Sequence, residues 1–256
     1  MKANFVDDGS IVKKIWGNAD TVLFIFAGAA AEFALNKAVD WLYFTGRLPA
    51  DPLGRLFSTV IYAQQIIFSD KAAALAAIDK ITAIHKAVEN NRGSQIPGWA
   101  YCDVLFLLIY YSITSFELLE RKFSDDEKQE VFDVFYRVGE RMKLTGLPGD
   151  FAQWTLMRDE HLHANLIRSE FTIDLYRQYK KHLGFIRYQI LKQVQLILVP
   201  KKVGTLLMTG KFKVYWIVPL LHIYKMLRIV KFEGLFKNAL LPAAYKKQIQ
   251  ALNISC

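Results

Sequence analysis

The dominant pattern along the chain is the return of apolar residues every three to four positions. Segments with this helical period follow one another, and alternating runs typical of strands are hard to find. The pattern therefore predicts an all-α fold. The expected helices cover residues 11–16, 21–43, 52–68, 70–90, 99–116, 125–145, 151–167, 169–183 and 184–199, and two or three shorter segments follow, divided by Pro200, Gly210 and Pro219.

The length and composition are those of one globular unit. The chain has 256 residues, of which 53% are hydrophobic, and this is enough for one large core. The connection at 90–98 is too short to be a domain linker, and no repeat interrupts the helical pattern. We therefore expect a single multi-helix domain over 1–256.

Two apolar runs, which begin at Thr21 and Val104, invite comparison with membrane spans. Glu32 interrupts the first, and both fall short of the roughly 18 to 20 uncharged residues that a span needs. Residues 1–10 lack the apolar core of a signal peptide. Cys102 and Cys256 form no metal or redox motif. We expect buried core helices and a cytoplasmic protein without a transmembrane span.

The positive charge is concentrated at one end of the chain. The net charge is +9, and residues 176–256 hold fifteen Lys and Arg against one acid, Glu233. In the stretch 213–236 these cations alternate with apolar residues. That mixture fits either amphipathic helices on an anionic membrane surface or core helices with solvated lysines. The aliphatic content argues against a nucleic-acid partner.

One histidine has an apolar setting. His85 lies at the centre of a helical stripe formed by Leu75, Ile78, Ile81, Thr82 and Val88. A desolvated imidazole needs a partner. It is either a core histidine bonded to a backbone carbonyl or an axial ligand of a metal or heme.

A second group of histidines suggests a different metal centre. Glu160 and His163 share a helix face at the i, i+3 spacing that di-iron bundles use, and His161 lies between them. Such bundles need two of these pairs, and the sequence has one, so a di-iron site is disfavoured. The chain also has no Gly-rich phosphate loop, GxSxG or HExxH motif, which leaves hydrolase and nucleotide-binding functions without support.

The start of helix 52–68 raises a separate question. Asp51 can cap the helix and Pro52 suits its first turn. Arg55 and Thr59 then lie one turn apart on the edge of the apolar stripe. A long cation in this position either snorkels to the surface or is aimed at an anion.

These residues occur in an order that resembles a known family. "DPLGRLFST", followed by a helix with "AIHKAV", resembles the heme-b oxygenases that include rubber oxygenase (latex clearing protein) and the MpaB oxygenase. "IWGNADTVLFIFAGAAAEFAL" and "TGLPGDF" are similar to further parts of that family. The resemblance covers residues 15–170, the heme-oxygenase-like core, and leaves 176–256 as a basic amphipathic helical extension packed on it.

The resemblance implies roles for three residues. His85 is the implied proximal ligand of a non-covalent heme b (iron protoporphyrin IX), with Arg55 and Thr59 beside the heme and dioxygen as co-substrate. The lysine that precedes the threonine in rubber oxygenase is Ser58 here, so lysine ligation is not expected. For that enzyme's general-base carboxylate, only Asp40 and Glu32 lie nearby in the sequence.

The resulting prediction is a heme-b-dependent oxygenase that acts on a hydrophobic substrate, such as an alkene, isoprenoid or lipid. Its basic end would contact an anionic membrane peripherally. Two alternatives stay open. One is a non-catalytic heme-binding protein that uses the same His85. The other is a cofactor-free peripheral membrane or lipid-binding protein in which His85 is a core residue and Arg55 a surface cation.

Overall fold

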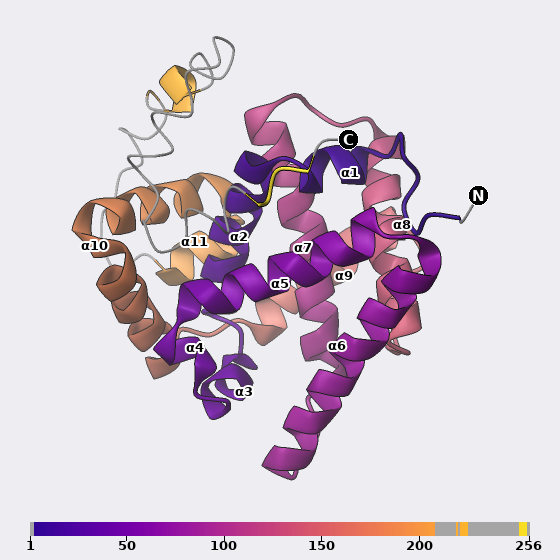
Figure 1. Ribbon diagram of the computed structural model, residues 1–256. Coiled ribbons are helices and arrows are strands. Elements are labelled where there is room, and N and C mark those ends of the chain that lie inside the picture. The colour runs from indigo at the N-terminus through magenta and orange to yellow at the C-terminus, as the bar shows by residue number, and fades with distance from the viewer. Residues whose placement is uncertain (1–2, 208–218, 220, 225–250, 255–256) are drawn as a thin grey trace.

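The computed structural model describes residues 3–207, 219, 221–224 and 251–254 (Figure 1). These residues form eleven helices and no strand, which confirms the predicted all-α fold. Most of the predicted basic extension beyond residue 207, including 213–218 and 225–236, lies outside the described residues. The helices are α1 Ile11–Trp16, α2 Ala19–Phe33, α3 Val39–Phe44, α4 Arg47–Ala50, α5 Pro52–Phe68, α6 Lys71–Arg92, α7 Gly98–Leu119, α8 Asp125–Arg141, α9 Phe151–Asn165, α10 Glu170–Leu198 and α11 Lys201–Leu207.

The centre of the fold is α7, which is apolar on nearly every side. It packs against α2, α8 and α9 and buries Phe106, Ile109 and Tyr111 almost completely. A helix without a polar face must be surrounded by other elements. By length and composition α7 could cross a membrane, but 72% of its most apolar window is buried inside the protein. It is therefore the core helix that the sequence predicts at Val104.

The prediction of one helix over 21–43 is wrong. The chain forms α2 and α3 with a turn between them, and this turn is tied to the end of α9. The Lys37 N–H donates to the Asn165 carbonyl at 2.9 Å, and the Ile167 N–H donates to the Leu35 carbonyl at 2.7 Å. The Asn36 side chain accepts from the Ala38 N–H at 2.8 Å. These long-range bonds compensate for the lost helical ones.

The helices near the predicted site begin where their caps predict. The Asp51 side chain accepts from the Gly54 N–H at 2.9 Å, and Pro52 opens α5. The Asp70 side chain caps α6 in the same way. Only residues 69–70 separate α5 from α6, so the two helices form a hairpin and pack against each other (Figure 1). Further along, Ser124 forms the capping box of α8.

Two features organise the C-terminal part. Gly184 leaves the helical conformation inside α10 (φ 72°, ψ 172°), at the boundary predicted between 169–183 and 184–199. Residues 252–254 return to the turn between α1 and α2 (Figure 1, yellow). There the Ile254 N–H donates to the Gly17 carbonyl at 3.0 Å, and the Asn253 side chain accepts from the Ala19 N–H at 2.9 Å. We call this the C-terminal clasp.

Candidate functional site

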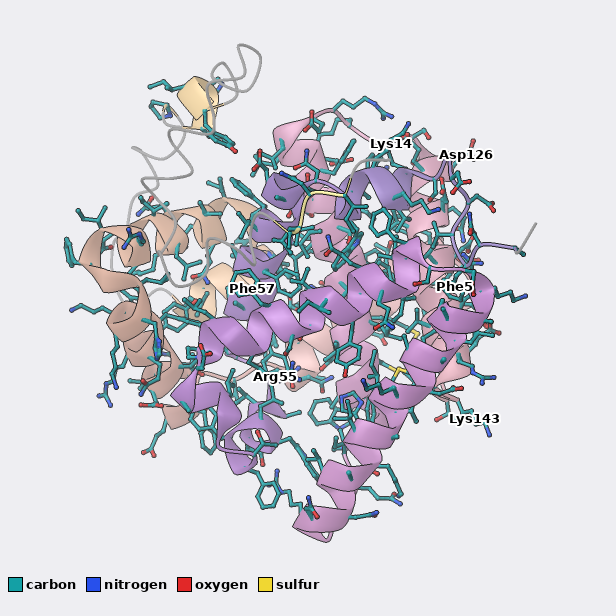
Figure 2. The ribbon with its side chains drawn as sticks, viewed as in Figure 1. Phe5, Lys14, Arg55, Phe57, Asp126 and Lys143 are labelled. Carbon is teal, nitrogen blue, oxygen red and sulfur yellow. The ribbon has the colours of Figure 1, made fainter. Side chains whose placement is uncertain are left out.

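Arg55 and Thr59 interact directly on α5. The Arg55 guanidinium donates from Nη1 to Thr59 Oγ1 at 2.8 Å and to Ser58 Oγ at 3.3 Å. Figure 2 shows Arg55 on the side of α5 that faces α3 and α6 in this view. The side chain is half-buried. The guanidinium is therefore held along its own helix, beside the hairpin partner α6, and does not extend freely into solvent.

His85 lies on α6 within the electrostatic influence of Arg55. Its side chain is half-buried, and Nδ1 has no hydrogen-bond partner in the part of the chain that the structure describes. Burial lowers the pKa of His85, the positive charge of Arg55 lowers it further, and Glu89 partly offsets both. The imidazole is therefore neutral at pH 7. A backbone carbonyl bonded to Nδ1, as expected of a satisfied core histidine, is not among the described contacts.

The ring of His85 is fixed by an aromatic neighbour from α7. Tyr101 meets it edge to face, with ring centroids 5.2 Å apart and an interplanar angle of 66°. The Tyr101 hydroxyl donates to Glu89 Oε1 at 3.2 Å, and the same oxygen accepts from the Ile96 N–H at 3.0 Å. Burial and the carboxylate of Glu89 raise the pKa of Tyr101, so the hydroxyl keeps its proton. Sequence reasoning missed this support because the periodicity of α6 does not show how α7, the next helix along the chain, packs against it.

Asp40 and Glu32, the two carboxylates considered for the general base, both accept hydrogen bonds from arginines. Asp40 Oδ2 accepts from Arg92 Nη2 at 2.7 Å, and the Arg92 guanidinium stacks 4.1 Å from the centre of the Trp41 ring. Glu32 is buried and accepts from both terminal nitrogens of Arg158 at 2.5 Å, with the Tyr111 hydroxyl as a further donor at 2.9 Å. Each acid is therefore already hydrogen-bonded to an arginine, at a charge-assisted distance.

The histidines of the di-iron alternative have other partners. His161 Nδ1 lies 2.6 Å from Asp103 Oδ1, and Asn36 donates to the other oxygen of Asp103 at 2.7 Å. His163 is exposed and its Nδ1 lies 2.9 Å from the Asp159 carbonyl oxygen. Within the described residues no group of three or more His, Cys, Asp or Glu side chains could hold a metal ion. A di-iron centre therefore gains no support.

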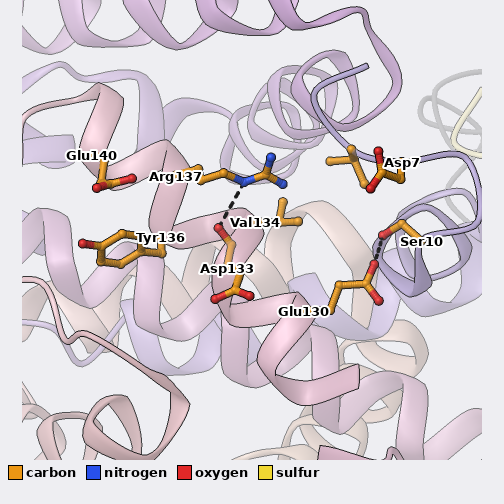
Figure 3. A pocket seen from close by; sticks show the side chains of 9 residues that line it. Asp7, Ser10, Glu130, Asp133, Val134, Tyr136, Arg137 and Glu140 are labelled. Carbon is orange, nitrogen blue, oxygen red and sulfur yellow. Dashed lines mark hydrogen bonds between the residues drawn. The ribbon is translucent and has the colours of Figure 1, made fainter. Parts of the chain in front are cut away.

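A surface cavity lies elsewhere, where the N-terminal segment meets α8 (Figure 3). Its volume is about 520 Å³, and its lining includes four carboxylates together with Arg137. Arg137 is already engaged, since it donates to the Phe5 carbonyl at 2.9 Å and stacks 4.7 Å from that residue's ring centre. Ser10 is hydrogen-bonded to Glu130 (Figure 3). None of the site residues predicted from the sequence lines this cavity.

One family model matches most of the chain. The family model described as the ER-bound oxygenase mpaB/B'/rubber oxygenase catalytic domain matches residues 14–215 of the chain. The chain belongs to this family. The match includes Arg55, Thr59 and His85 and extends past the resemblance seen at 15–170, so α10 and α11 are part of the family domain. Neither the curated proteins nor the solved structures give a significant match.

The family is that of an oxygenase catalytic domain, which supports an oxygenase activity for this chain. The α5–α6 hairpin brings the predicted residues together, because Arg55 touches Thr59 and its charge acts on His85. A neutral imidazole with an unpartnered buried nitrogen fits the chemistry of an axial ligand.

Proposed function

We propose that the protein is a heme-b-dependent oxygenase that acts on a hydrophobic substrate, with His85 as the axial ligand. The observation that carries the proposal is the state of His85. A buried imidazole nitrogen without a hydrogen bond costs free energy unless a bound group satisfies it. The lowered pKa keeps the ring neutral and therefore able to donate an electron pair to iron.

The neighbours of His85 have complementary tasks. Tyr101, itself hydrogen-bonded to Glu89, packs against the ring and restricts its orientation, so that little conformational entropy is lost when a ligand bond forms. Arg55 supplies a permanent positive charge suited to a heme propionate or another anionic group. Thr59 fixes the guanidinium through its hydroxyl. Bound heme b would supply the iron that reacts with dioxygen, and such chemistry belongs to the cofactor.

The family description, which names rubber oxygenase, supports a hydrophobic substrate. Asp40 and Glu32 are both paired with arginines, and we give neither of them the role of base. We propose an alkene substrate of isoprenoid or lipid type, with dioxygen as co-substrate. Recognition would then depend on apolar contact and exclusion of water rather than on charge.

The test is an absorption spectrum of the heme-supplemented protein between about 350 and 650 nm. We expect a Soret band for the wild type and for His163→Ala, which removes an exposed histidine of α9. His85→Ala should lose the band, and Arg55→Ala should retain heme more weakly while keeping the wild-type circular dichroism. A folded His85→Ala protein with full heme content would refute the axial role.

The same preparations separate the two alternatives. Dioxygen consumption in the presence of an isoprenoid alkene would support the oxygenase. Stable heme binding without any dioxygen consumption would favour a non-catalytic heme-binding protein. A wild-type protein that binds no heme, yet still binds lipid vesicles, would overturn the proposal in favour of a cofactor-free lipid-binding protein.

A further inference from the structure

The bend in α10 makes a projecting corner. Gly184, with its positive φ of 72°, divides the helix into two arms. A side chain at this φ would be strained, and glycine avoids that strain. Figure 1 shows the bend at the left edge of the molecule, away from α6. Both arms pack inward, through Leu175 and Tyr179 before the bend and through Leu198 after it, and these three side chains are buried.

The outside of this corner is apolar. Phe185 and Ile186 directly follow the bend, and their exposed fractions are 65% and 72%. Single exposed apolar residues are common on protein surfaces and need no explanation. Two adjacent large side chains, both mostly exposed and both at a projecting bend, differ from that background. Among the described large apolar side chains, the other one that is more than 60% exposed is Leu156 on α9, and its apolar sequence neighbour Met157 packs against the core instead.

Cations flank the apolar pair on both sides. Lys180 and Lys181 are exposed in the last turn before the bend. Arg187 and Lys192 follow it, and Arg177 lies one turn before the two lysines. The sequence contains no Asp or Glu between residues 175 and 232. The corner therefore has a single sign of charge around an apolar tip.

We infer that this corner, residues 177–192, docks onto an anionic lipid membrane. Apolar side chains at the tip can enter the boundary between headgroups and acyl chains, while lysine and arginine stems reach the phosphates. The uniform positive charge complements an anionic leaflet. The patch does not suit nucleic acid, because the exposed phenylalanine and isoleucine at its centre would find no apolar surface on a phosphate backbone. The inference does not depend on heme binding.

The experiment is co-sedimentation of the full chain with vesicles. We expect binding to vesicles of phosphatidylcholine with about one third phosphatidylserine, weaker binding to phosphatidylcholine alone, and a loss of binding as salt screens the charges. The double variant Phe185→Ser/Ile186→Ser should lower the partition coefficient about tenfold or more. Lys180→Glu/Lys181→Glu should do the same and should also remove the preference for phosphatidylserine.

The matched control is Leu156→Ser, which removes an equally exposed apolar residue from α9 and should bind as the wild type does. Circular dichroism melts verify that all variants fold. Three outcomes would overturn the inference. The wild type could bind neither kind of vesicle, the Phe185→Ser/Ile186→Ser variant could bind as the wild type does, or Leu156→Ser could lose as much vesicle binding as that double variant. A change in oligomeric state on substituting Phe185 and Ile186, with vesicle binding unchanged, would instead identify the corner as an interface between copies.

Discussion

The stability of the fold should depend strongly on the buried ion pair between Glu32 and Arg158. Their side chains are 3% and 6% exposed, and both terminal guanidinium nitrogens donate to the carboxylate at 2.5 Å. Arg158→Met keeps an unbranched apolar stem and removes the guanidinium with its charge. Glu32 is then a buried carboxylate with the Tyr111 hydroxyl as its remaining described donor. Removing one member of a buried ion pair leaves the other charge without its partner, and this lowers the free energy of unfolding by about 3–5 kcal/mol.

This loss is measured by chemical denaturation at pH 7, and for a chain of this size it corresponds to a fall in Tm of roughly 6–20 °C. Adding Glu32→Gln should recover part of the loss, because it removes the buried charge.

The control is Arg121→Met, which breaks a pair with Glu127 at 2.6 Å on the surface, where the Arg121 side chain is 56% exposed. Solvent screens that pair, so a much smaller loss is expected. If Arg158→Met costs less than about 1 kcal/mol, or no more than Arg121→Met, then water reaches the buried pair and the reasoning from burial is wrong.

Two further predictions concern the packing of α2 and the titration of His85 on α6. In Gly28→Ala the new Cβ would overlap the ring of Tyr111, so a loss of about 1–3 kcal/mol is expected in chemical denaturation. Gly204→Ala, whose Cβ would meet only Val199 at an ordinary 3.7 Å, should be neutral or stabilising, and equal losses would contradict the packing argument. Because the pKa of His85 is lowered in the folded state, the unfolded chain takes up a proton first as pH falls below about 6.5. The free energy of unfolding of the wild type should therefore fall relative to His85→Leu, by at most about 1.4 kcal/mol per pH unit, and a pH-independent difference would refute this.

Local signals in the sequence predict local structure well. Asp51, Pro52 and Asp70 mark the starts of α5 and α6, and the short link between these helices implies that Arg55 and His85 lie on neighbouring helices. The contact between Arg55 and Thr59 follows from their separation of four positions on one helix. This part of the site needs no knowledge of the rest of the fold.

Long-range partners could not be predicted in the same way. The apolar period continues from α2 into α3, and what ends α2 is a set of bonds to residues far along the chain, such as that of Lys37 to Asn165. The arginines that neutralise Asp40 and Glu32 are separated from them by 52 and 126 positions. Periodicity contains no information on such pairs, because they depend on how the helices pack.

The C-terminal clasp imposes an order on folding during synthesis. It joins residues 17 and 19 to residues 253 and 254, and Gln64 also donates to the Leu252 carbonyl at 2.8 Å. Until residue 254 has left the ribosome, the Ala19 N–H and the Gly17 carbonyl lack these partners and must be solvated by water. Closing so long a loop is entropically costly and slow. The helices between can therefore assemble while the chain is being made, but the turn between α1 and α2 reaches its final bonded state only afterwards.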